Sequence, residues 1–171
     1  MRGASMIVID IGCSPAGGDS IGYLVREFKP TVLYGFDPSP AVKQIEGTFP
    51  IGNTKVIVER KAAWINNGWL NWVPTGYGVT TDQEPENFKF QRVRCFDLAE
   101  FILSTGEDGI HLKMDCEGAE YPILEHMIQR GASDKISLLW IEWHFFEEDS
   151  SDRKRKIVEG MPHVDYHSWN L

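Results

Sequence analysis

Acidic side chains follow four of the apolar segments of this 171-residue chain. They are Asp10, Asp37, Asp115 with Glu117, and Glu142, which is followed by His144. If those segments are parallel strands, their carboxyl ends meet at one edge of a sheet, where open α/β sheets bind ligands. Carboxylates and an imidazole gathered there could move a proton, hold the hydroxyls or cationic groups of a ligand, or bind a divalent metal.

A glycine-rich loop, GCSPAGG at residues 12–18, follows the first of these segments. Glycines at such a turn let backbone N–H groups at a helix start approach a ligand closely. Asp37 lies 19 residues beyond Gly18, the spacing expected for a carboxylate that holds ribose hydroxyls. The dinucleotide pattern G-x-G-x-x-G is absent, because Ser14 stands where the second glycine is required. The loop therefore predicts a nucleotide-like ligand.

The charge of Asp10, which we expect beside this loop, bears on which ligand that is. A carboxylate 4 Å from a pyrophosphate charge would be opposed by about 4 kcal/mol at an effective dielectric constant of 20. A cationic ligand would be favoured instead. S-adenosylmethionine (SAM) carries an ammonium, a sulfonium and an adenosine ribose, so it suits a site with Asp10 at one end and Asp37 at the other.

The hydrophobic pattern supplies the elements that would position these residues. Short apolar runs predict buried strands at 6–11, 31–37, 55–59, 110–115 and 136–143, and a further short strand at 164–167. Helices are predicted after Asp19 or Ser20, after Ser39, after Asp97, and over 119–130 and 152–159. This alternation predicts an α/β fold with a mostly parallel sheet of order 3-2-1-4-5 and helices on both faces.

Residues 64–92 break the alternation, because Asn, Gly, Pro and Thr are interspersed with aromatics and no helical period is present. We expect an irregular insertion on the substrate side, in which 69–73 and 88–96 could form small strands. The aromatic side chains of residues 64–77 could stack on a sugar or base, or pack as a small core or a dimer contact. Both interpretations, and homo-oligomerisation with them, are left open.

The composition, 42% hydrophobic and 25% charged, is typical of one soluble globular domain over residues 1–171. No apolar run is long enough to span a membrane and no secretory signal is recognisable, so a cytoplasmic location is expected. Three cysteines without C-x-x-C spacing predict neither disulfides nor a cysteine zinc site. The net charge of −8 disfavours nucleic acid as a partner, and the basic run 153–156 is interpreted as a solvated helix face.

Three segments resemble known motifs. Residues 8–12 (VIDIG) with Gly17-Gly18, and residues 35–40 (GFDPSP), resemble the first two motifs of class I SAM-dependent methyltransferases. Residues 112–120 (LKMDCEGAE) resemble the signature of the FkbM family. The resemblance implies a Rossmann-like methyltransferase fold, SAM as methyl donor, and O-methylation of a hydroxyl of a sugar or small molecule. The first loop is one residue longer than the usual D-x-G-x-x-x-G, and the C-terminal strand pair is expected to be shortened.

The resemblance also implies roles for individual residues. Matched by position, the cofactor-binding residues would be Asp10, Gly12, Cys13, Ser14, Gly17, Asp37, Pro38, Ala62, Ala63 and Asp115. Within this set, Asp10, Gly12 and Gly17 would line the methionine end of SAM. Asp37 would hold the ribose, and Ala62 or Ala63 would lie near the adenine. Asp115 and Glu117 would border the transferring methyl group.

Methyl transfer to an alcohol oxygen requires an aligned hydroxyl and a base. Asp115, Glu117 and His144 are the catalytic candidates, because they follow adjacent predicted strands and clustered carboxylates can have raised pKa values. Asp115, Glu142 and His144 could instead bind Mg²⁺, Mn²⁺ or Zn²⁺, which would position and acidify the hydroxyl. Glu120 is interpreted as a charge favoured by the dipole of the helix it begins.

Three alternative functions are also considered. An RNA ribose 2'-O-methyltransferase is suggested by Pro15 beside the glycines and by the basic run 153–156, and is opposed by the net charge of −8. A SAM-binding or interaction module without catalysis is consistent with the short C-terminal part. An NAD-dependent oxidoreductase is disfavoured by Asp10 and by the missing G-x-G-x-x-G pattern.

Overall fold

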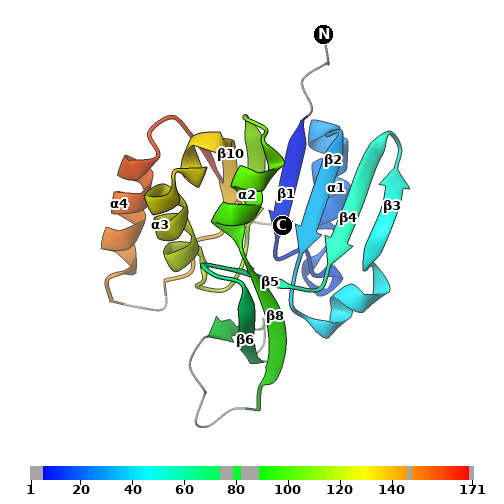
Figure 1. Ribbon diagram of the computed structural model, residues 1–171, viewed down its shortest axis with the longest axis horizontal. Coiled ribbons are helices and arrows are strands. Elements are labelled where there is room, and N and C mark those ends of the chain that lie inside the picture. Colours follow the sequence, from blue (N-terminus) through cyan, green and yellow to red (C-terminus); the bar gives the residue numbers. More distant parts are fainter. Residues whose placement is uncertain (1–5, 74–78, 82–88, 146–147, 170–171) are drawn as a thin grey trace.

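The computed structural model describes residues 6–73, 79–81, 89–145 and 148–169. Its main sheet has seven strands in the order β11-β10-β9-β1-β2-β4-β3 (Figure 1). These are β1 (Ile7–Ile11), β2 (Val32–Phe36), β3 (Gly47–Ile51), β4 (Thr54–Glu59), β9 (Ile110–Met114), β10 (Ile136–Ile141) and β11 (Asp165–Ser168). Every pairing is parallel except that of β3 with β4. The predicted mixed α/β fold with a mostly parallel sheet is confirmed.

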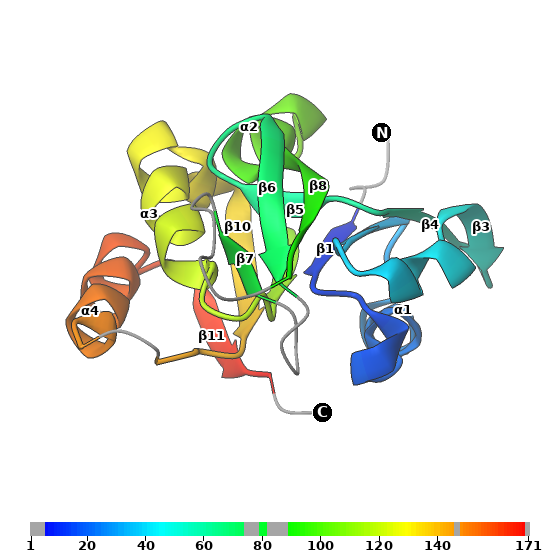
Figure 2. The same cartoon turned by 90° about the horizontal axis from the view of Figure 1, so that it is seen from below.

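A second sheet contains four strands in the order β5-β8-β6-β7. They are β5 (Ala62–Trp64), β6 (Gly68–Val73), β7 (Val79–Thr81) and β8 (Gln91–Asp97). Figures 1 and 2 place this sheet beyond the end of the main sheet at which the parallel strands terminate. Within the described part of 64–92, the small strands suggested at 69–73 and 88–96 are present as β6 and β8. All four residues 70–73 of β6 are buried, although Asn71 interrupts the apolar run that would mark a strand in the sequence.

Helices cover both faces of the main sheet (Figure 2). Helix α1 (Ser20–Phe28) lies on one face, α2 (Leu98–Thr105) and α3 (Glu120–Arg130) lie on the other, and α4 (Ser150–Gly160) packs against α3. The predicted caps Asp19 and Asp97 are confirmed, because Asp19 accepts a hydrogen bond from the N–H of Gly22 and Asp97 accepts one from the N–H of Glu100. Ser39 begins its helix without a side-chain capping hydrogen bond.

The helix predicted after Ser39 is only a five-residue 3-10 helix, η2 (Pro40–Gln44). It ends there because the chain turns directly into β3, the antiparallel edge strand that the sequence did not predict. Gly52, which has φ +59°, provides the left-handed residue of the β3–β4 hairpin. At the opposite edge, β11 pairs in parallel with β10. In the described ranges, no helix is both long and apolar enough to cross a membrane.

The two sheets share one apolar core. Side chains of β1 and β9 meet those of α2 and α3 on one face, and Leu70, Trp72, Val93 and Phe96 of the second sheet belong to the same cluster. A separate cluster under α1 contains Val8, Leu24, Leu33, Val56 and Trp169. The shared core fixes the second sheet against the carboxyl edge of the main sheet, where the acidic residues lie.

The importance of this core can be measured on α2. Ile102 is completely buried, so Ile102→Ala should lower the free energy of unfolding by about 2–5 kcal/mol through lost burial and the cavity it leaves. Leu103, the next residue, is 37% exposed, and Leu103→Ala should change stability by less than about 1 kcal/mol. Urea unfolding of both variants checks this, and equal losses would contradict the assignment of the core.

Candidate active site at the carboxyl edge of the main sheet

Backbone hydrogen bonds continue past the ends of the central strands. The N–H of Gly12 donates to the carbonyl of Phe36 (2.9 Å), that of Asp115 donates to Ile11 (3.1 Å), and that of Glu142 donates to Met114 (3.0 Å). The residues that follow β2, β1, β9 and β10 are therefore held side by side, as the sequence predicted for its acidic residues.

Gly12 is required where the first loop meets β9. Its φ is +82°, and a Cβ built there would lie 1.8 Å from the carbonyl oxygen of Asp115. No other residue fits this contact without moving the backbone. The loop continues through η1 (Pro15–Gly17), where the side chain of Ser14 accepts a hydrogen bond from the N–H of Ala16. The glycine thus brings the backbone of the loop against Asp115.

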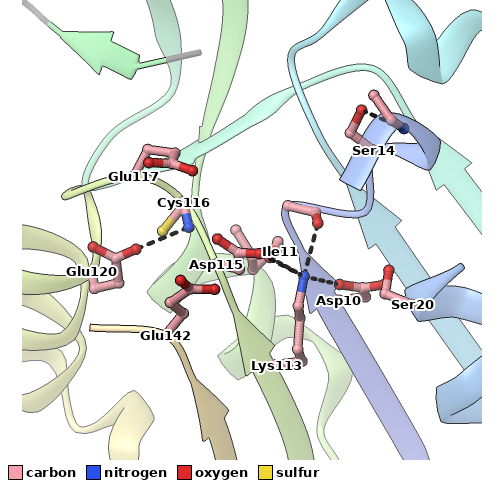
Figure 3. A network of polar contacts seen from close by, with 12 residues as sticks. Asp10, Ile11, Ser14, Ser20, Lys113, Asp115, Cys116, Glu117, Glu120 and Glu142 are labelled. Atoms are coloured by element: carbon pink, nitrogen blue, oxygen red, sulfur yellow. Dashed lines mark hydrogen bonds and ion pairs between the residues drawn. The ribbon is translucent and has the colours of Figure 1, made fainter. Parts of the chain in front are cut away.

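Asp10 does not present a free charge to this loop. Its side chain is fully buried, accepts a hydrogen bond from the hydroxyl of Ser20 (2.6 Å) and forms an ion pair with Nζ of Lys113 (3.1 Å) (Figure 3). The two residues are register partners on β1 and β9. The expectation that the charge of Asp10 selects a cationic ligand is therefore corrected, because Lys113 compensates that charge.

Lys113 connects the first loop to Asp115. Its ammonium donates to the carbonyl oxygens of Gly12 (2.8 Å) and Ile11 (3.3 Å) and lies 3.9 Å from Oδ2 of Asp115. Burial alone would lower the pKa of Lys113, but the charges of Asp10 and Asp115 raise it. Sequence reasoning missed this residue, because a lysine in a strand is ordinarily exposed.

Asp37 follows β2 and lies beside the first loop. The N–H of Ser39 donates to Oδ1 of Asp37 (2.7 Å), and the hydroxyl of Ser39 donates to that of Ser14 (3.1 Å), which joins the two loops. Burial raises the pKa of Asp37, although the hydrogen bonds from Ser39 oppose the shift. The carbonyl of Pro38 accepts a hydrogen bond from Nε of Arg60. Further donors would therefore stabilise the ionised form of Asp37.

Three of the residues expected to bind a cofactor, Cys13, Ala62 and Ala63, have small side chains buried in the apolar core. Cys13 belongs to the core under α1, and burial raises its pKa well above the ordinary value, so it stays a thiol. Ala62 and Ala63 on β5 pair with Cys95 and Phe96 of β8, and their methyl groups are in the shared core. These three residues could meet a ligand only through their backbone.

The structure brings the three predicted catalytic residues together. Asp115, Glu117 and His144 each contribute one side-chain atom to a group in which all atoms lie within 4.8 Å of one another. Nε2 of His144 is 3.4 Å from Oε2 of Glu117 and 3.9 Å from Oε1 of Glu142. Figure 3 shows the carboxylates of Asp115, Glu117 and Glu142 on one side of Lys113 and that of Asp10 on the other. We call Asp115, Glu117 and His144 the edge cluster.

Glu120 orients His144 and is more than a helix-start charge. It is completely buried and accepts hydrogen bonds from the N–H groups of Cys116 (2.9 Å) and Gly118 (2.8 Å). Its Oε1 is also 3.0 Å from Nδ1 of His144. Because a carboxylate only accepts, Nδ1 carries the hydrogen, and Nε2 is left facing Glu117. No local pattern could reveal a partner 24 residues away along the chain.

The protonation of the edge cluster changes the role expected of His144. Burial alone would lower the pKa of His144, but its hydrogen bond to Glu120 and the charges of Glu120, Glu117 and Asp115 raise it to about 9. The imidazole is therefore protonated at neutral pH and cannot accept a proton as predicted. Burial raises the pKa values of Asp115 and Glu117, with contributions from neighbouring carboxylates. These two groups are the better bases.

Three of the four basic residues of the run on α4 pair with acidic side chains, one of them the predicted Asp152. Arg153 forms two hydrogen bonds with Glu125 (2.8 and 2.9 Å), and Arg155 bonds Asp152 and Glu159. Lys156 pairs with Asp152, and Lys154 lies over the rings of Trp143 and Phe145. These contacts account for the run as a paired helix face.

The mostly parallel sheet, with a glycine loop after β1 and carboxylates after β2, β9 and β10, is compatible with a methyltransferase fold. A family model described as the methyltransferase FkbM domain matches residues 22–167, and the chain belongs to this family. The resemblance noted at residues 112–120 is thereby confirmed. Searches of curated proteins and of solved structures gave no match.

Proposed function

We propose that the chain is a SAM-dependent O-methyltransferase that acts on a hydroxyl of a sugar or another small molecule. The observation that carries the proposal is the position of the edge cluster. Two carboxylates with raised pKa values, Asp115 and Glu117, follow β9, and the backbone of Asp115 is in contact with Gly12 of the first loop. Groups able to accept a proton thus lie beside the loop that the family resemblance assigns to SAM.

The residues present are suited to SAM. SAM carries a methyl group on a sulfonium. An oxygen nucleophile can attack the carbon of this methyl group, and the thioether is the leaving group. The buried carboxylate of Asp37 would accept hydrogen bonds from the ribose hydroxyls. These donors would stabilise its ionised form, which burial disfavours. The backbone of residues 12–18 would hold the methionine end, and the backbone of Ala62 or Ala63 would lie near the adenine. Asp10 and Lys113 support the loop from beneath it.

Within this proposal the protein aligns the acceptor and removes its proton. The acceptor oxygen bonds to the methyl carbon while the carbon–sulfur bond breaks, and the electron pair stays on sulfur. The hydroxyl proton passes to Glu117, whose raised pKa suits a general base. Asp115, against the first loop, borders the methyl group. The protonated His144, held by Glu120, fixes the position of Glu117.

The acceptor class can be tested with SAM that carries a labelled methyl group. The purified protein is incubated with pools of sugars, pools of other hydroxyl-bearing small molecules, and RNA, and the label is traced. The proposal predicts label in a sugar or small molecule as a base-stable methyl ether. Label in RNA would favour the ribose 2'-O-methyltransferase. Binding of SAM without transfer to any pool would favour a module that has lost catalysis.

A further inference from the structure

The edge cluster combines one imidazole nitrogen and two carboxylates at close range. Oε2 of Glu117 and Nε2 of His144 are 3.4 Å apart, and all three contributed atoms lie within 4.8 Å. Oxygen and nitrogen ligands about 2.1 Å from one ion are about 3–3.5 Å apart at octahedral or tetrahedral angles. The separation of Glu117 from His144 already meets this requirement. The atom contributed by Asp115 lies within 4.8 Å of both others.

His144 has the hydrogen-bonded carboxylate partner that is typical of metal-binding histidines. A ligand histidine nearly always donates its other ring N–H to a carboxylate or carbonyl, which fixes the ring and makes it a better ligand. Here Nδ1 donates to Glu120, which is completely buried and is itself fixed by the N–H groups of Cys116 and Gly118. Nε2 is thereby aimed at the carboxylates of the edge cluster rather than at solvent.

The surrounding charge also favours a cation. Asp115, Glu117 and Glu142 lie around Nε2 of His144. Lys113, which lies 3.9 Å from Asp115, is engaged by Asp10 and two carbonyl oxygens. A divalent cation that replaces the proton on Nε2 would balance these charges. Two glutamates lie near Nε2 of His144. Glu117 is closer to this nitrogen than Glu142, and its side chain is 15% exposed, against 42% for that of Glu142.

We propose that Asp115, Glu117 and His144 bind one divalent cation of the Mn²⁺ or Zn²⁺ class, with Glu120 as the group that orients the histidine. Glu117 takes the place that the sequence had given to Glu142. Mixed carboxylate and imidazole donors suit these ions. A cation there would hold the acceptor oxygen and lower the pKa of its hydroxyl. Glu117 would bind the cation through one carboxylate oxygen, and its other oxygen would accept the proton. This catalytic consequence rests on the proposed methyl transfer, whereas cation binding itself does not.

The test measures cation binding in the absence of SAM and acceptor. The full chain is stripped with EDTA and titrated with Mn²⁺, and free Mn²⁺ is counted by electron paramagnetic resonance. One equivalent is expected to bind, with a histidine ¹⁴N coupling in the spin-echo spectrum of the bound ion. Glu117→Gln should weaken binding by at least about tenfold, because even residues that only support a ligand cost that much. Asp108→Asn, which removes a carboxylate that is 79% exposed on another surface, should leave binding unchanged.

Two results on the wild-type chain would overturn the proposal. One is the absence of saturable Mn²⁺ binding to the wild-type chain, and the other is bound Mn²⁺ without histidine nitrogen coupling. Both are read on the wild type, so a variant that fails to fold cannot obscure them. Equal binding by wild type and Glu117→Gln would exclude Glu117 as a ligand and overturn the site as stated. A chain that transfers methyl groups yet binds no cation would retain the proposed function and lose only this inference.

Discussion

Replacing Lys113 with methionine should destabilise the protein by about 3–5 kcal/mol, because it leaves the buried carboxylate of Asp10 without its ion pair. The side chain of Lys113 is 2% exposed and that of Asp10 is completely buried. The substitution also removes the donor that holds the carbonyls of Ile11 and Gly12. Urea unfolding at pH 7 measures the loss directly. The double variant Asp10→Asn with Lys113→Met should recover part of it, because no unpaired charge is then buried.

An exposed lysine–aspartate pair provides a matched control for this buried pair. Lys135 pairs with Asp108 at 2.6 Å, but Asp108 is 79% exposed, and exposed pairs contribute only about 0–1 kcal/mol. Lys135→Met should therefore cost at most about 1 kcal/mol. If Lys113→Met is no more destabilising than Lys135→Met, the buried pair does not have the structural role described above.

The second large effect is expected at Glu117. Glu117→Gln keeps the shape of the side chain and removes its ability to accept a proton, so kcat for methyl transfer should fall by about 10²- to 10⁴-fold. SAM affinity should be nearly unchanged, because Glu117 is not among the residues proposed to hold SAM. Single-turnover transfer and SAM titration, measured on the same preparation, separate the two quantities.

Glu125→Gln provides the comparison for this variant. Glu125 lies on α3 and bonds Arg153, away from the edge cluster, so kcat should be retained. Loss of SAM binding in Glu117→Gln in parallel with kcat would contradict the assignment of Glu117 as the proton acceptor. It would place that residue in the SAM site instead.

The elements that hold the site could be predicted because each has its own local signal. The apolar runs that become β1, β2, β4, β9 and β10, and the caps Asp19 and Asp97, are properties of a few adjacent residues. Strand β3 has no such signal, since its residues are mostly exposed and it pairs only along one edge. The second sheet depends on a core shared with α2 and α3, which a local pattern cannot show.

The chemistry of the site was predictable in its residue types but not in its contacts. Asp115, Glu117 and His144 were predicted to meet because they follow neighbouring strands, and they do. The partners that set their charges are distant in sequence. Lys113 neutralises Asp10 because β1 and β9 are in register, and Glu120 reaches His144 across 24 residues. Sequence reasoning therefore assigned a free charge to Asp10 and a basic nitrogen to His144.

The most direct test of the proposed function is calorimetric titration of the purified chain with SAM, S-adenosylhomocysteine and NADH, repeated with Asp37→Ala. The account predicts saturable binding of SAM and of S-adenosylhomocysteine and none of NADH. Asp37→Ala should weaken SAM binding by at least about tenfold, since a hydrogen bond to a charged group contributes about 1.5–3 kcal/mol. Binding of NADH alone, or SAM binding that is unaffected by Asp37→Ala, would contradict it.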